Sequence, residues 1–93
     1  MRVNCLADLK RLPIGTKLRL VECLMGPVPE EKQGRILAKV QSNAVAFLTP
    51  KDNYQGHLSW LHLPPAKQFV ATSDGFTVLE DTGEVAARYV FDD

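Results

Sequence analysis

The clearest pattern in the chain is a double alternation of apolar and polar side chains between Arg35 and Thr49. Gln41-Ser42-Asn43 separates the two alternating halves and has the composition of a tight turn. Period-two alternation on both sides of a turn predicts a β-hairpin, with Asn43 suited to the left-handed position of a short loop. The side chains expected in the core of this hairpin are Ile36, Val40, Val45 and Phe47.

Similar alternation predicts further short strands on both sides of the hairpin. They cover Lys17–Leu24, His57–Leu63, Phe76–Glu80 and Val85–Phe91. In the first of these, Leu18, Leu20 and Leu24 share a face with Glu22. We expect this acidic residue near the strand end, where the twisting sheet reaches solvent, because a carboxylate is rarely buried without a partner.

Two short helical segments complete the predicted elements. Residues 5–11 suit a short helix that Asn4 caps and that ends before Pro13. Pro64 to Phe69 reads as a single helical turn with proline at its start, which returns Phe69 to the core.

Two loops interrupt the strands. Met25–Gly34 contains two prolines, two glycines and a charged cluster, a composition that argues against a regular strand. Pro50–Gly56 carries Tyr54 at its tip. Long loops on a rigid β scaffold are common sites of binding, and the alternative for Met25–Gly34 is a tolerated surface insertion.

These elements predict an all-β chain in which residues 1–93 form one small domain. The expected architecture is a small SH3-like barrel or a rolled antiparallel meander of five to six strands with one short N-terminal helix. Between residues 16 and 80 the order of elements resembles SH3-like small barrels: a long loop after the first strand, a central meander and a helical turn. The resemblance implies binding rather than catalysis. The acidic loop and clustered aromatic residues that recognise proline-rich peptides in that family cannot be placed here.

The charges of the chain are unevenly distributed although the formal net charge is zero. Residues 1–20 carry five cations and one anion, giving +4, and residues 74–93 carry six anions and one cation, giving −5. We expect the two ends to lie together and neutralise each other; head-to-tail self-association or a polar partner surface is the alternative. Zero net charge removes the general electrostatic attraction to nucleic acid or an anionic membrane, and it is compatible with a homodimer.

The two cysteines, Cys5 and Cys23, have no metal-ligand or redox spacing. No signal peptide and no apolar run of transmembrane length is apparent, so we expect a cytoplasmic protein with reduced thiols. A Cys5–Cys23 disulfide is the alternative.

Candidate chemistry is sparse. His57 and His62 are five residues apart on one predicted strand and therefore on opposite faces, which disfavours a shared metal. Ser59 and His57 share a face, which raises the hypothesis of a small hydrolase, but no nucleophile elbow surrounds Ser59. No phosphate-binding glycine loop is present, so no cofactor is expected.

The function predicted from the sequence is a non-enzymatic binding module that acts by protein–protein interaction, as an adaptor or inhibitor. Its size and lack of motifs resemble products of bacterial mobile elements. The predicted partner-binding residues are Val28, Glu31, Tyr54 and Trp60. The alternative is a single-stranded nucleic-acid-binding barrel that uses Lys17, Arg19 and Lys39, with Phe47, Tyr54 and Trp60 available for stacking.

Overall fold

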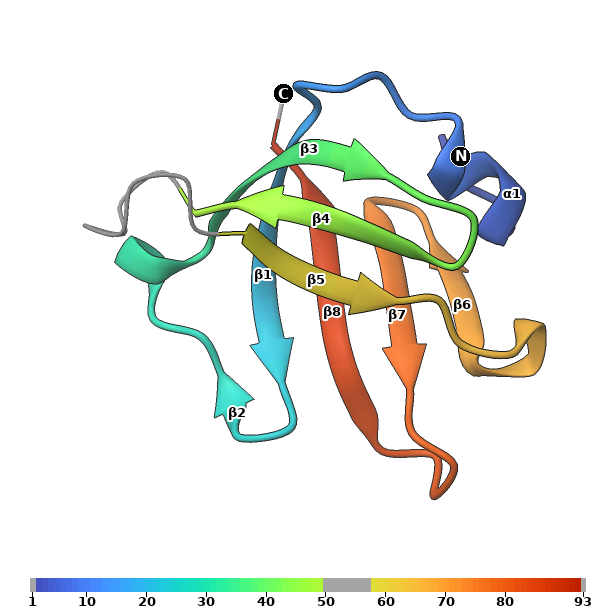
Figure 1. Cartoon of the computed structure of the whole chain (residues 1–93). Helices are drawn as coiled ribbons and strands as arrows, with labels where there is room; N and C mark the ends of the chain where they lie inside the picture. The colour runs from blue at the N-terminus through green and yellow to red at the C-terminus, as the bar shows by residue number, and fades with distance from the viewer. Residues whose placement is uncertain (1, 50–57, 93) are drawn as a thin grey trace.

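The alternating segments form eight strands in residues 2–49 and 58–92, the part of the chain that the computed structural model describes (Figure 1). The strands are β1 (Lys17–Cys23), β2 (Gly26–Pro27), β3 (Gly34–Val40), β4 (Ala44–Leu48), β5 (Leu58–His62), β6 (Phe69–Thr72), β7 (Gly75–Leu79) and β8 (Val85–Phe91). Across the described residues, helical structure is limited to α1 (Leu6–Lys10) and two 3₁₀ turns, η1 (Glu30–Lys32) and η2 (Ala66–Gln68). The all-β prediction is confirmed, whereas the predicted count of five to six strands is too low.

The strands belong to one antiparallel sheet in the order β5-β4-β3-β1-β8-β7-β6, with β2 paired to β1. In Figure 1, β3, β4 and β5 run across the front of β1, β8, β7 and β6, so the sheet folds over into two layers. Within the described residues β5 and β6 remain unpaired with each other at the two ends of this strand order, and the sheet does not close. The predicted rolled sheet therefore agrees with the structure better than a closed barrel does.

A stack of aromatic rings joins the two layers. The ring of Tyr89 lies 5.1 Å from that of Phe47 in the front layer and 5.0 Å from that of Phe76 behind it, measured between centroids. Phe76 in turn lies 5.5 Å from Phe69. Burial raises the pKa of Tyr89 to about 12, against the opposing charge of Arg35. Stacked rings of this kind add to the stability that their buried area supplies.

The β3–β4 hairpin forms as predicted, with residues 41–43 between its strands, but its core face differs. The left-handed conformation predicted for Asn43 is not adopted, since no described residue other than glycine has a positive φ. Leu37 and Phe47 are opposite each other and fully buried, and Val40 is opposite the buried Val45. The register shifts between Leu37 and Lys39, which is a β-bulge. Because a bulge inserts one residue, it reverses the alternation, so Leu37 takes the core position that was predicted for Ile36.

A second register shift explains the position of Glu22. The pairing between β1 and β8 shifts between Leu20 and Glu22, so Leu20 lies opposite Tyr89 and Glu22 lies opposite Arg88. The carboxylate is thereby turned to the outer face of the sheet, opposite a cation. Leu24, predicted to share the apolar face, lies beyond the end of β1 and is exposed.

Helix α1 packs on the core through Leu9, which is fully buried. Its N-cap is Cys5 rather than Asn4, and no side chain caps it. Asp8 instead accepts a hydrogen bond of 3.0 Å from the backbone N–H of Asn4. Lys10 donates to the carbonyl of Ser42 at 3.2 Å, so the helix also holds the turn of the β3–β4 hairpin.

The oppositely charged ends of the chain meet, as expected, because β1 and β8 are neighbours in the sheet. Arg19 lies 3.7 Å from the carboxylate of Asp92, and the backbone N–H of Asp92 donates to the carbonyl of Lys17. Within the C-terminal segment itself, Arg88 forms an ion pair, at 3.2 Å, with Asp74 in the β6–β7 turn. A hydrogen bond from Thr72, and then the charge of Arg88, lower the pKa of Asp74.

Candidate functional site

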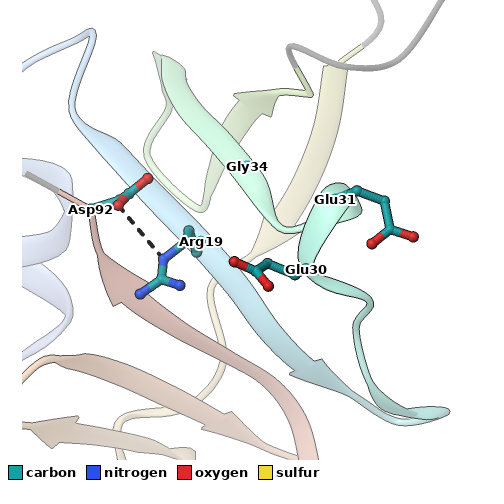
Figure 2. A pocket seen from close by; sticks show the side chains of 5 residues that line it. All are labelled: Arg19, Glu30, Glu31, Gly34 and Asp92. Carbon is teal, nitrogen blue, oxygen red and sulfur yellow. Dashed lines mark ion pairs between the residues drawn. The ribbon is translucent and has the colours of Figure 1, made fainter.

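A polar cavity of about 510 Å³ lies where β1 changes its neighbour from β3 to β2 (Figure 2). The first part of β1 pairs with β3, and its last residues pair with β2 on the same edge. The intervening residues leave the sheet and form η1. The cavity is lined by Arg19, Glu30, Glu31, Gly34 and Asp92.

The segment that contains η1 is held by side chains as well as by the backbone. The amide of Gln33 donates to the carbonyl of Val28 at 2.8 Å, and the Gln33 carbonyl accepts from the N–H of Leu20. Arg35 donates to the carbonyls of Lys32 and Gly34 at 2.8 and 2.7 Å. These contacts fix the position of Glu30 and Glu31 relative to β1.

Carboxylates outnumber cations in this cavity. Figure 2 shows the side chain of Glu30 directed toward Arg19, with Glu31 directed away from it, and Arg19 paired with Asp92. Three buried side-chain atoms form no hydrogen bond among the described residues: Oε1 of Gln33, Nε of Arg35, and Nε of Arg19, which lies 3.7 Å from Asp92 as an ion pair. With three carboxylates and one guanidinium, the lining favours a cationic group on a binding partner and disfavours a phosphate.

The other notable surface feature is the tip of the β1–β2 hairpin, formed by Leu24 and Met25. The two side chains are 56% and 96% exposed. Cys23 and Gly26 are opposite each other at the base of this turn, and Gly26 has a φ of +107°, a backbone conformation that favours glycine. The turn thus fixes two adjacent apolar side chains in solvent, where they have no structural role.

Sequence reasoning selected only half of this tip: Met25 opens the predicted binding loop Met25–Gly34, whereas periodicity grouped Leu24 with the strand. The Met25-Gly26 pair just beyond the last strand residue was the available signal for a turn. The composition of the Met25–Gly34 segment also argued against any strand, yet Gly26 and Pro27 form β2. The N–H of Val28 continues this pairing by donating to the carbonyl of Val21 at 3.0 Å.

The predicted partner-binding residues occupy different parts of the surface. Val28 is half-buried just after β2, and Glu31 is exposed in η1 at the cavity. Trp60 is 40% exposed on the outer face of β5, opposite the buried Ala46. Tyr54 lies outside the described residues. Val28 and Glu31 therefore lie in the same segment of the chain, whereas Trp60 lies on a different element, β5.

The residues of the nucleic-acid hypothesis share the outer face of the sheet but differ in availability. Lys17 and Lys39 are exposed, whereas Arg19 is engaged by Asp92. Lys39 and Trp60 lie on either side of Ala46 in neighbouring strands. Phe47, a predicted stacking residue, is fully buried in the core and has no accessible face.

Residues considered for catalysis or metal binding do not assemble within the described part of the chain. Ser59 lies opposite Phe47 on the core-facing side of β5, and His57 lies outside the described residues. In residues 2–49 and 58–92, no group of three metal-ligating side chains is present. Cys5 and Cys23 are free thiols.

A search of the helices within the described residues finds none long and apolar enough to cross a membrane. No protein-family model, curated protein or solved structure matches the chain.

Proposed function

We propose that this protein is a non-enzymatic binding module that acts by protein–protein interaction. The observation that carries the proposal is the exposed apolar tip of the β1–β2 hairpin. Contiguous exposed apolar side chains on a small protein mark interaction sites, and Met25 is almost fully exposed. Methionine suits such a site because its flexible, polarisable side chain fits varied apolar surfaces.

The acidic cavity supplies the second part of the proposed contact surface. It lies at the far end of the same β2–η1 segment that follows the tip, and η1 is fixed by the Gln33 and Arg35 contacts. The matching partner has an apolar recess for Leu24 and Met25 and a basic group for Glu30, Glu31 and Asp92. An adaptor or an inhibitor with an SH3-like order of elements, encoded on a bacterial mobile element and located in the cytoplasm, would use such a surface.

The proposal is tested by affinity capture from the native host followed by quantitative mass spectrometry. The wild-type chain is expected to retain a partner protein that the double variant Leu24→Ser, Met25→Ser loses. Ile14→Ser is the matched control, because Ile14 is also exposed, at 61%, but lies in the turn before β1. Equal retention by all three chains would refute the assignment of the tip.

A further variant tests the residues that the sequence predicted. Replacing Val28, Glu31 and Tyr54 together by alanine is expected to weaken the same interaction, because two of these positions belong to the β2–η1 segment. If that triple variant retained every partner, the segment would not belong to the contact surface.

Single-stranded nucleic-acid binding is a second candidate, favoured by one observation. Lys39 and the exposed Trp60 flank Ala46 on one sheet face, which combines a cation with a stacking ring. Trp60 is the only tryptophan, so its fluorescence reports directly on stacking. Quenching by a labelled or unlabelled oligonucleotide at low salt would support this function, and unchanged fluorescence at micromolar protein would exclude it.

A further inference from the structure

The edge strand β5 presents a row of backbone hydrogen-bonding groups that no strand of the described residues pairs with. Leu63 donates to the carbonyl of Asn43 at 2.8 Å, which continues the register of β5 with β4. Hydrogen-bonded pairs alternate in an antiparallel ladder, so Ser59 and Leu61 bond to β4. The N–H and C=O groups of Leu58, Trp60 and His62 therefore point away from β4, where no strand in the described residues pairs with them.

This edge lacks the features that protect edge strands from pairing. The segment Leu58–His62 has no charged residue and no proline, and its ladder with β4 has no bulge. Natural edge strands are commonly protected by charges, prolines, bulges or short length. The other edge, β6, is shorter, with four residues.

From these observations we infer that β5 pairs antiparallel with β5 of a second copy of this chain about a two-fold axis at Trp60. In this register Trp60 lies opposite the partner's Trp60, and Leu58 lies opposite the partner's His62. Each outward N–H and C=O of the three residues then finds a hydrogen-bonding partner. A register shifted toward the C-terminus would place Pro64, which has no N–H, in the ladder.

A second copy fits this edge better than a charged segment of another protein. A two-fold axis makes the contact self-complementary, and the uncharged strand brings no like charges together when it meets itself. The formal net charge of zero also removes general repulsion between copies. The two tryptophan side chains meet on the outer face of the joined sheet, where Trp60 is 40% exposed in the single chain. The inference goes beyond the proposed function, since it does not involve the β1–β2 tip.

Sedimentation equilibrium of the full chain, from micromolar to millimolar concentration, tests the pairing. The wild type is expected to dimerise, and Trp60→Lys or Trp60→Glu alone to weaken the dimer by at least about tenfold, because like charges then lie opposite each other. An equimolar mixture of the two variants is expected to restore association, because opposite charges then face each other. Val70→Lys is the matched control, since Val70 is 42% exposed on the other edge strand, and it is expected to leave the dimer unchanged.

Residue-resolved hydrogen exchange gives a second readout, with circular dichroism confirming that each variant is folded. The amides of Leu58, Trp60 and His62 are expected to gain protection as concentration rises, whereas those of Ser59 and Leu61 are protected throughout. A wild type that stays monomeric, a mixture that fails to associate, or an equal effect of Val70→Lys would overturn the inference. None of these results would affect the partner-capture test of the β1–β2 tip.

Discussion

The hairpins β3–β4 and β1–β2 both contain apolar side chains, but these side chains have opposite surroundings. In β4 the four residues Ala44 to Phe47 are all buried, so both faces of that strand are covered. At the β1–β2 turn, Leu24 and Met25 are exposed. The difference shows that apolar content alone does not define a core. Position relative to the two layers decides whether an apolar side chain stabilises the fold or remains available to a partner.

The largest effect is expected from Gly75, which lets β7 approach β8. A Cβ atom at this position would lie 2.0 Å from the carbonyl oxygen of Tyr89 and 2.8 Å from Cα of Val90, both backbone atoms. Gly75→Ala must therefore separate two strands that carry the aromatic stack. We expect a loss of about 4 kcal/mol or more in the free energy of unfolding, measured by urea denaturation. A loss below about 1 kcal/mol would contradict this close approach.

Removing a core side chain of the buried hairpin is expected to have the next largest effect. Leu37→Ala should cost about 2–5 kcal/mol of stability, because Leu37 is fully buried opposite Phe47. Ile36→Ala, on the outer face, is the matched control and should cost clearly less. A larger cost for Ile36→Ala would show that the bulge in β3 is absent.

Alkaline pH should destabilise the protein through Tyr89. Its pKa is raised to about 12 in the folded protein, against about 10 in the unfolded chain. The folded protein thus favours the neutral form of Tyr89, and this preference contributes roughly 3 kcal/mol at most to the free energy of unfolding. The contribution is fully present below pH 10 and is lost as the pH rises through 12. Tyr89→Phe should lose that pH dependence relative to the wild type in urea denaturation between pH 10 and 12. Parallel curves for the two chains would contradict the prediction.

The smallest effect on stability is expected at the exposed tip. Leu24→Ser together with Met25→Ser should change the free energy of unfolding by no more than about 0.5 kcal/mol, because neither side chain is packed. A cost comparable to that of Leu37→Ala would remove the distinction between the two hairpins.

Much of the fold was predictable because its signals are local. Alternation placed β3, β4, β5, β7 and β8 within a residue or two of their observed limits, and proline marked the helical turn η2. Bulges were not predictable, since one inserted residue exchanges the core-facing and outer-facing side chains of a strand without changing its composition. This is why Leu37 replaced Ile36 in the core and why Glu22 left the apolar face.

The candidate site was less predictable because its parts are distant in sequence. Arg19, Glu31 and Asp92 come together only once β1 has paired with both β3 and β8. The Met25–Gly34 segment, which includes Met25 of the apolar tip, was proposed as a binding loop from its composition, whereas Leu24 of the same tip was assigned to a strand.

Site-specific photo-crosslinking tests the central claim, binding at the β1–β2 tip, most directly. A photoreactive residue is placed at position 25 or, as a control, at position 14, which is also exposed, and the chain is irradiated in its native host. We predict a protein adduct that forms from position 25 and not from position 14. No adduct from position 25, or the same adduct at equal yield from both positions, would contradict the proposal.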